Sequence, residues 1–340
     1  MGYWESNEGG AGMSHTETIP KIPFEIMRQR QALPLDAKIA FTEMRIRQWY
    51  SHWGGDVYVS FSGGKDSTVL LDIVKRLYPD VPAVFCDTGM EYPEVRKLAL
   101  DKADVVLRPD LTFKQVLKKH GYPIPGKEQA LYIRQARHST EHMREVRMSG
   151  GRYSISKKWI PLVSAPFEVS EKCCDVMKKK PFARFEKETG RKRMTAMMAY
   201  ESSRRERRYM QYGCNSFNEG NPSSMPMGIW LEQDVLRYIV ENSLEYAGCY
   251  GEIVEGKDGN LHCTREDRTG CMFCMFGIAF DSTPNRFQRM QRDYPKQWAY
   301  CIETLGIGKV LEYCGIPYEY TPTIFDLGSD LSARNGVLHG

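Results

Sequence analysis

Apolar residues recur along the chain with two periods, one typical of helices and one typical of strands. Over 35–53 the apolar positions have near-helical spacing, and Gly54-Gly55 marks the end of this predicted helix. A β-branched and aromatic run over 56–61 then predicts a strand. A glycine-containing loop follows, and the apolar positions over 68–78 predict a helix with one buried face. This order of strand, loop and helix is repeated further along.

The repeats define the fold class. We predict further strands at 83–86, 105–107 and 194–199, and further helices at 93–102, 112–120 and 232–241. Strands that alternate with helices at this spacing predict an α/β fold, with a doubly wound, mostly parallel sheet covered on both faces. Residues 123–165 are rich in Arg and His and have no clear period, so they receive no assignment. Residues 285–315 are expected to be helical.

Changes in composition divide the chain into three parts. Residues 1–20 contain little apolar sequence and read as a flexible lead. Residues 21–245 hold the strand and helix repeats and are predicted to form one nucleotide-binding α/β domain. Residues 246–340 are predicted to form a Cys-rich and helical C-terminal appendage, whose tail from Asp326 is expected to be mobile.

Composition narrows the class of protein. The chain has 340 residues, of which 41% are hydrophobic and 26% charged, as in ordinary soluble domains. No apolar run approaches the roughly 18 residues that cross a bilayer, and the N-terminus lacks a secretory pattern. We therefore expect a cytoplasmic protein without a membrane partner. In a reducing compartment its ten cysteines favour metal ligation or redox chemistry over disulfides.

The loop between the first strand and its helix has the features of an anion site. Unpaired backbone N–H groups at a helix N-terminus point outward, and the helix dipole favours negative charge there. Gly63 and Gly64 let phosphate oxygens approach the backbone, Lys65 adds a positive charge, and Ser62 and Ser67 offer hydroxyl donors. A plain surface turn is the alternative, but the order of strand, loop and helix favours phosphate binding.

Four motifs together resemble a known family. Ser62-Gly63-Gly64-Lys65-Asp66-Ser67 resembles the PP-motif SGGxDS of adenine-nucleotide α-hydrolases, which differs from the GxxxxGK[ST] loop. Three further segments are similar to those of the phosphoadenosine phosphosulfate (PAPS) reductase-like branch, and the resemblance covers about residues 56–240. They are Cys86-Asp87-Thr88-Gly89 with Tyr92-Pro93-Glu94, Ala196 to Arg205, and Trp230 with Asp234-Val235 and Tyr238. Met198 departs from the family pattern, because an arginine is expected there.

The resemblance implies roles for individual residues. It implies that the nucleotide is bound by the loop and by an aspartate after the second strand, namely Ser62, Gly63, Gly64, Lys65, Asp66, Ser67 and Asp87. It also implies catalytic roles for Lys65, Asp66, Asp87 and Arg205. Simpler interpretations exist for three residues. Asp87 could cap the end of a strand, Trp230 could be a core aromatic, and Glu201 could pair with nearby arginines.

Two cysteine pairs suggest a metal centre. Cys271 and Cys274 form a CxxC element in a glycine-flanked turn, which is half of a ligand set. Cys173-Cys174, followed by Lys178 and Pro181, resembles the CC-x-x-x-K-x-x-P segment of adenylyl-sulfate reductases, which implies a 4Fe-4S cluster held by Cys173, Cys174, Cys271 and Cys274.

Alternatives to this ligand set stay open. Cys263 competes for the fourth position, because Cys263-x7-Cys271-x2-Cys274 resembles the cluster segment of the PP-loop subunit in DNA phosphorothioation systems. Spacing does not exclude structural Zn²⁺ in place of a cluster, and free thiols are a third possibility. The other cysteines are expected to be small buried residues.

The C-terminal sequence bears on the reaction. Reductases of this family carry a nucleophilic cysteine in a C-terminal ECGLH tail, whereas no cysteine follows Cys314 here. The leading hypothesis is an ATP pyrophosphatase that adenylates an acceptor with the help of Mg²⁺, for sulfur transfer from a donor protein to a nucleic acid or a small molecule. The alternatives are reduction of a sulfonucleotide and a non-catalytic nucleotide-sensing subunit. The acceptor and any homo-oligomer are left open.

Overall fold

A computed structural model describes residues 22–218, 220 and 222–322 of the chain. The predicted lead at 1–20 and the tail from Asp326 lie outside the described residues. A central sheet of six strands has the order β3-β2-β1-β4-β6-β5. Its strands are β1 (Val57–Phe61), β2 (Ala83–Cys86), β3 (Val105–Leu107), β4 (Lys192–Met194), β5 (Asn215–Ser216) and β6 (Ser223–Ser224).

The sheet has the predicted doubly wound form. Strand β1 pairs in parallel with β2 on one side, where Val59 lies opposite Ala83, and with β4 on the other, where Val59 lies opposite Met194. All the other pairings in the sheet are parallel except that between β5 and β6. The chain order therefore reverses between β1 and β4. In open α/β sheets the crevice at the carboxyl ends of the strands beside such a reversal binds ligands.

Helices cover both faces of the sheet. Val57, Val59 and Phe61 pack into a core shared with α2 (Leu35–His52), α3 (Lys65–Leu77) and α10 (Glu232–Glu241). Tyr58 points to the opposite face, where it packs against Phe185 of α8 (Lys180–Thr189). Because successive residues of a strand point to opposite faces, the continuous apolar run of β1 fits a strand that is buried on both sides.

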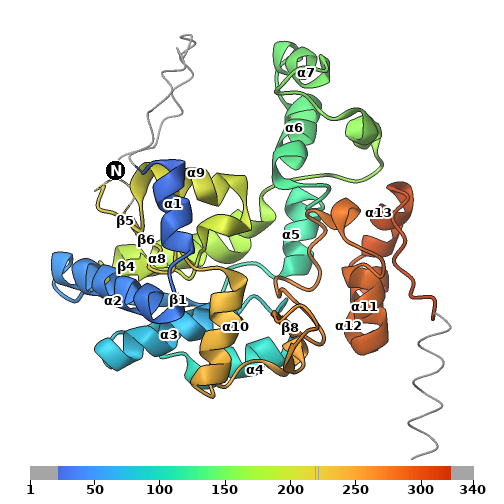
Figure 1. The fold of residues 1–340 in the computed structure, drawn as a ribbon. Coiled ribbons are helices and arrows are strands. Elements are labelled where there is room, and N and C mark those ends of the chain that lie inside the picture. Colours follow the sequence, from blue (N-terminus) through green and yellow to red (C-terminus); the bar gives the residue numbers. More distant parts are fainter. Residues whose placement is uncertain (1–21, 219, 221, 323–340) are drawn as a thin grey trace, which may run out of the picture.

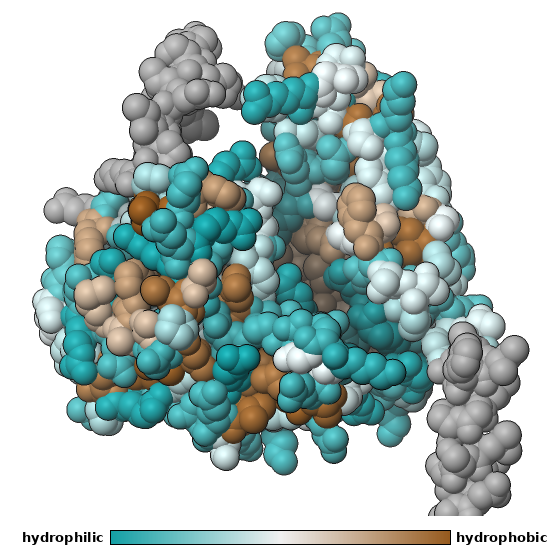
Figure 2. Space-filling model, viewed as in Figure 1, coloured by the Kyte–Doolittle hydropathy of each residue, from teal (hydrophilic) through white to brown (hydrophobic). Residues whose placement is uncertain are grey.

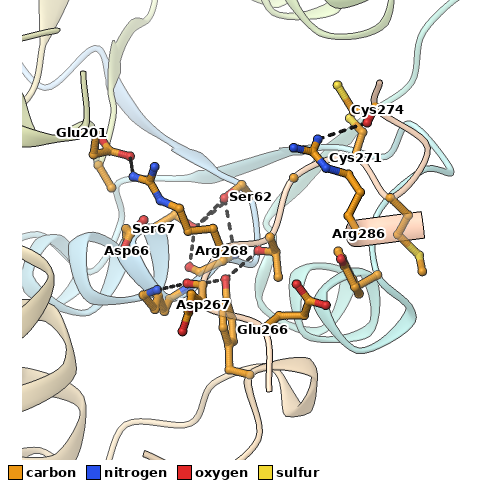
Figure 3. Close-up of a pocket in the computed structure, with 18 of the residues that line it drawn as sticks. Ser62, Asp66, Ser67, Glu201, Glu266, Asp267, Arg268, Cys271, Cys274 and Arg286 are labelled. Atoms are coloured by element: carbon orange, nitrogen blue, oxygen red, sulfur yellow. Dashed lines mark hydrogen bonds and ion pairs between the residues drawn. The ribbon is translucent and has the colours of Figure 1, made fainter. Parts of the chain in front are cut away.

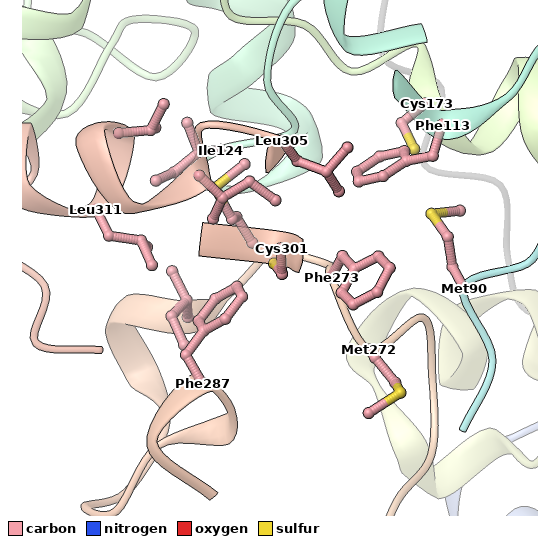
Figure 4. Close-up of a cluster of buried hydrophobic side chains, with 14 of the residues drawn as sticks. Met90, Phe113, Ile124, Cys173, Met272, Phe273, Phe287, Cys301, Leu305 and Leu311 are labelled. Carbon is pink, nitrogen blue, oxygen red and sulfur yellow. The ribbon is translucent and has the colours of Figure 1, made fainter. Parts of the chain in front are cut away.

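A second core lies beside the sheet. It joins residues from α4 (Pro93–Lys102), α5 (Phe113–His120) and α6 (Lys127–His138) to residues from α11 (Arg286–Asp293) and α13 (Ile307–Tyr313). Figure 4 shows Phe113 and Ile124 in this cluster with Phe273, Phe287 and Leu311. The C-terminal region thus shares its core with residues of the predicted α/β domain, and the boundary at 245/246 remains a prediction.

The remaining elements complete two sides of the molecule, seen in Figure 1 with α1 and α9 on one side and α5, α6, α7 and α13 on the other. They are α1 (Phe24–Gln31), α7 (Glu141–Met148), α9 (Ser203–Tyr212), α12 (Pro295–Ala299) and a hairpin of β7 (Ile253–Glu255) and β8 (Leu261–Cys263). No helix in the described residues is long and apolar enough to span a membrane.

One predicted strand is misplaced. The strand expected at 194–199 ends at Met194, and Ala199–Glu201 form a short 3-10 helix. The sequence pattern did not predict where this strand begins, because charged residues such as Lys192 and Arg193 are unusual in an interior strand. The Arg193 guanidinium makes two hydrogen bonds to Glu186 of α8, at 2.7 and 2.9 Å, which offset the cost of its partial burial.

Candidate functional site

A cavity of about 860 Å³ opens at the carboxyl ends of β1 and β4, where the sheet order reverses. Figure 3 shows the phosphate loop between two sets of side chains, with Glu201 and Arg268 on one side and Cys271, Cys274 and Arg286 on the other. The loop, the segment after β4 and the segment 265–274 therefore line one continuous cavity.

The loop after β1 is held in shape from within. Gly63 has φ of +74°, and a Cβ atom there would lie 2.5 Å from the carbonyl oxygen of Val95, so no larger residue fits. The Ser62 and Ser67 hydroxyl oxygens lie 3.0 Å apart, and the Ser67 hydroxyl donates to the Gly64 carbonyl at 2.9 Å. These contacts fix the turn that places the N-terminus of α3 at the cavity.

Lys65 is buried below the loop and already has partners. Its side chain is 5% exposed, and Nζ lies 2.8 Å from Oε1 of Glu232. The ammonium group also donates to the Asp267 carbonyl and lies 5.2 Å from the ring centre of Tyr250. The backbone N–H of Lys65 donates to the Tyr250 hydroxyl at 3.2 Å. Glu232 therefore pairs with the Lys65 ammonium group, and the Tyr250 hydroxyl accepts a hydrogen bond from one backbone amide of the loop.

A group of charged residues lies next to Asp66. Burial raises the pKa of the Asp66 carboxyl, while Lys65 and Arg268 act against this rise. Glu201 pairs with Arg205 and also with Arg268, whose Nη2 lies 2.7 Å from Oε1. Burial and the neighbouring Arg268 lower the pKa of Arg205. The Glu201 carboxylate thus pairs with two guanidinium groups, and Asp66 lies within electrostatic range of both.

Asp87 lies in a different hollow. This second hollow of about 530 Å³ is lined by Asp87, Arg96 and Arg108, and Asp87 does not line the cavity of the phosphate loop. The Asp87 carboxylate is 6% exposed and accepts two hydrogen bonds of 2.8 Å from Arg96. These bonds lower the pKa of Asp87 despite its burial. The structure therefore separates Asp87 from the other residues for which a nucleotide-binding role was predicted.

Trp230 and Asp234 support the fold rather than the cavity. The Trp230 ring is fully buried, and its indole N–H donates to the Thr42 hydroxyl at 2.8 Å. Asp234 pairs with the buried Lys38 at 2.5 Å. Neither residue lines the cavity, which agrees with the simpler interpretation of Trp230 as a core aromatic.

The two cysteine pairs converge. Cys271 and Cys274 line the cavity, and Cys173 lies within electrostatic range of Cys174, Cys271 and Cys274. Burial raises the pKa of the Cys271 thiol to about 11, and the nearby Lys178 opposes this rise. The Lys178 side chain hydrogen-bonds Cys271. Folding thus brings together segments that are almost one hundred positions apart in the sequence.

The four thiols suit a soft metal centre in their chemistry. Four cysteines are the usual ligand set of a 4Fe-4S cluster and also occur in structural zinc sites. In the described part of the chain, no group of three or more His, Cys, Asp or Glu side chains is arranged to hold a metal ion. Cys263 lies elsewhere, and besides burial the charges that act on it most strongly are Lys65 and Asp267.

Several cavity residues were not predicted from the sequence. Glu232 and Tyr250 contact the loop, and two arginines of α11 line the far end of the cavity. Arg286 pairs with Asp281 at 2.7 Å, and Arg289 pairs with Glu266 at 2.8 Å. The spacing of Arg286 and Arg289 by three positions places both on one face of a helix, which was the only local signal.

Comparison with known proteins finds similarity over one segment of the chain. The family model described as the phosphoadenosine phosphosulfate reductase domain matches residues 56–154. Adenosine 5'-phosphosulfate reductase 1 of Bacillus subtilis is 28% identical over 101 residues, which are 27% of this chain and 43% of that protein. Adenosine 5'-phosphosulfate reductase of Bacillus velezensis is 26% identical over 102 residues, again 27% and 43% of the two chains. The chain thus spans less than half the length of these relatives.

A solved structure is also similar. The phosphoadenylyl-sulfate reductase of Candida auris, solved as a phosphate complex, aligns with a TM-score of 0.37 and 16% identity, over 67% of this chain and 90% of that one. The sheet is doubly wound and has a glycine loop at the reversal of strand order, the position where open α/β sheets bind ligands. Over residues 56–154 the chain is similar to the PAPS reductase-like family.

Proposed function

We propose that the protein is a PP-loop ATP pyrophosphatase of the PAPS reductase family, which adenylates an acceptor for sulfur transfer. The observation that carries this proposal is that Ser62 and Lys65 line the same cavity as Cys271 and Cys274. An anion-binding loop and thiols in one cavity suit a reaction that activates a group through phosphate and then replaces it with sulfur. A cavity of about 860 Å³ has room for a nucleotide and part of a second substrate.

The chemical step has a simple balance. An acceptor oxygen forms a bond to the α-phosphorus of ATP, and the bond from that phosphorus to the oxygen bridging to the β-phosphate breaks. Pyrophosphate leaves with the electron pair. Asp66 is our candidate for the base that takes the acceptor's proton, because a raised carboxyl pKa suits proton transfer near neutral pH. A sulfur nucleophile from a separate donor then attacks the activated carbon, and AMP leaves.

The basic residues would stabilise the charge that develops on phosphate. Lys65 and Arg205 both line the cavity, and the N-terminus of α3 points its amides toward it. Lys65 would exchange its contact with Glu232 for a phosphate oxygen. Mg²⁺, bound with the nucleotide, would neutralise part of the triphosphate charge.

We also propose that Cys173, Cys174, Cys271 and Cys274 hold a 4Fe-4S cluster. This proposal is supported by Cys173, which lies close enough to Cys174, Cys271 and Cys274 to interact with them electrostatically. In the described residues the four side chains do not form the tight tetrahedron that a single zinc ion requires. Each cysteine of a cluster binds its own iron, so the four sulfur atoms stand further apart than around zinc. The cluster would place a redox-active group beside the nucleotide.

Reduction of a sulfonucleotide is the second candidate. The reductase names of the two Bacillus relatives favour it. The last cysteine of the described residues, Cys314, does not line the cavity, so Cys271 or Cys274 would have to act as the nucleophile. If Cys271 and Cys274 are ligands of a cluster, neither is available as the nucleophile, and the sulfonucleotide would not be reduced.

One pair of assays separates these functions. Protein prepared without oxygen is incubated with ATP, Mg²⁺ and candidate acceptors, and pyrophosphate is measured. In parallel it is incubated with adenylyl sulfate or PAPS and a thiol, and sulfite is measured. We expect pyrophosphate, at a rate that Lys65→Ala lowers at least about tenfold and that the exposed control Lys97→Ala leaves unchanged. Sulfite in place of pyrophosphate supports the reductase, and nucleotide binding without either product supports a sensing subunit.

A further inference from the structure

The helix that borders the cavity has an excess of positive charge. Helix α9 carries four arginines and one glutamate in its ten residues. Arg204 and Arg207 are exposed, and within the described residues neither takes part in an ion pair. Arginines in a structural network are normally paired with carboxylates, as Arg286 and Arg289 are in this chain. The Arg207 Nε donates to the Ser203 carbonyl at 3.3 Å, but among the described residues no carboxylate neutralises Arg204 or Arg207. These two exposed charges therefore suit an external anion.

The positive charge continues into the cavity. Ser202 caps α9 by accepting a hydrogen bond from the Arg205 backbone at 3.3 Å, and this cap sets Arg205 at the cavity wall. Arg205 and Arg268 share the single carboxylate of Glu201. Figure 3 shows Glu201 and Arg268 on the side of the cavity away from the cysteines. A strand whose phosphates lie along α9 would thus extend into the cavity that contains the loop at 62–67.

Aromatic side chains stand at both ends of the helix. Tyr200 precedes α9 and is 37% exposed, and Tyr212 ends it and is 47% exposed. Arg208 lies 5.8 Å from the ring centre of Tyr212. A helix of this length spans about 15 Å, which is roughly the length of four stacked nucleotides at 3.4 Å each. The tyrosine rings at the two ends of α9 can stack on unpaired bases, and the arginines between them can contact the phosphates of the same strand.

We propose that the acceptor is a single-stranded nucleic acid, which lies along α9 with phosphates on Arg204 and Arg207 and a base on Tyr200. This inference rests on the proposed function, because it names the acceptor of that site. In the space-filling view the molecule is hollowed between the side that carries α9 and the side that carries α6 and α13, and hydrophilic residues flank the hollow (Figure 2). A single strand can place one unstacked nucleotide in this hollow, whereas a duplex keeps its bases paired and stacked inside the double helix.

Binding is tested without ATP, so that the result does not depend on catalysis. Labelled single-stranded RNA and DNA of about twelve nucleotides, and their duplexes, are titrated by fluorescence anisotropy at several salt concentrations. We expect Arg204→Ala with Arg207→Ala to weaken single-strand binding at least about tenfold and to lower the salt slope by about 1.4, or 0.7 for each phosphate contact. Tyr200→Ala should weaken it about five- to 100-fold, whereas Tyr200→Phe should keep the affinity.

Matched controls decide the outcome. Lys97→Ala with Lys309→Ala removes two exposed cations from α4 and α13, and it should leave the affinity within about twofold. Equal weakening by this control, equal binding of polyglutamate, or tighter binding of duplexes would each overturn the proposal. Thermal unfolding of each variant checks the fold. If strands bind as expected but no pyrophosphate is formed, the nucleic-acid site stands and the adenylation reaction fails.

Discussion

The ammonium group of Lys65 lies 2.8 Å from the carboxylate of Glu232, so the cation of the phosphate loop is paired with an acid from the first turn of α10. The two residues differ in exposure, since the Lys65 side chain is 5% exposed and that of Glu232 is 38% exposed. A phosphate that reaches Lys65 therefore has to compete with Glu232. We therefore expect the affinity for a nucleotide to depend on a residue outside the loop.

Replacing Glu232 should strengthen nucleotide binding. In Glu232→Gln the competing charge is gone, and we expect ATP to bind about two- to tenfold more tightly. In Lys65→Ala one charge-assisted phosphate contact is lost, and binding should weaken about ten- to 150-fold, from roughly 1.5–3 kcal/mol. Calorimetric titration measures both, and Glu241→Gln at the far end of α10 is the control. Weaker binding in Glu232→Gln would mean that Glu232 assists the nucleotide directly.

Two glycines with the same backbone conformation should respond differently to alanine. Gly63 and Gly89 have φ of +74° and +71°, but only at Gly63 would a Cβ atom collide with the neighbouring backbone. Gly89→Ala should cost about 1–2 kcal/mol of unfolding free energy, from the left-handed conformation alone. Gly63→Ala should cost more and should also abolish ATP binding. Urea unfolding and ATP titration test this, and equal losses would contradict the steric argument.

The protein purified without oxygen should contain a 4Fe-4S cluster. About four irons per chain and a broad absorbance near 400 nm are the expected signs. Cys174→Ser should abolish them, whereas Cys263→Ser should spare them, because Cys263 lies near Lys65 instead of the cysteine pairs. Zinc without iron would refute the cluster. Loss of iron in Cys263→Ser but not in Cys173→Ser would refute the ligand assignment alone.

The ion pair of Asp87 should make stability fall in acid. Arg96 holds the pKa of Asp87 below its ordinary value near 3.8, so the carboxylate stabilises the fold fully above about pH 5. This stabilisation is lost as the pH falls below about 4 toward the folded-state pKa. Asp87→Asn should therefore lower the unfolding free energy at pH 7 by about 1.5–3 kcal/mol and should flatten its loss in acid.

Urea unfolding at a series of pH values measures this effect. Asp110→Asn is the matched control, because the Asp110 carboxylate is 69% exposed in its pair with Arg184 and should contribute almost nothing. An Asp87→Asn variant as stable as the wild type at pH 7 would show that burial cancels the gain from the ion pair.

Sequence patterns located the elements whose residues are buried by apolar contacts. The strands at 83–86 and 105–107 and the helices at 93–102 and 232–241 have the predicted bounds, because apolar runs there begin and end at polar or proline residues. Helices α6 and α7 were not predicted. Helix α7 has no buried residue, and the Arg-rich α6 is held by contacts such as that of Arg134 with Glu171, which no local pattern reveals.

The same limit applies to the cavity. The loop residues could be recognised because one short segment contains them all. Glu232 and Tyr250 reach Lys65 from 167 and 185 positions away, so their role depends on tertiary packing. The convergence of the cysteine pairs was expected from family resemblance, and the separation of Asp87 from the phosphate loop was not.

The backbone N–H of Met272 donates to the carbonyl of Met90 at 2.7 Å, which fastens the CxxC turn to the loop after β2. Both residues belong to the core that α5 and α6 share with α11 and α13. The loop after β2 and the CxxC turn therefore share one core. We expect the two to unfold together, so that amide hydrogens of Met272 and its neighbours exchange with solvent only when this core opens. A fragment that stops at residue 245 would expose half of that core to water and would tend to aggregate.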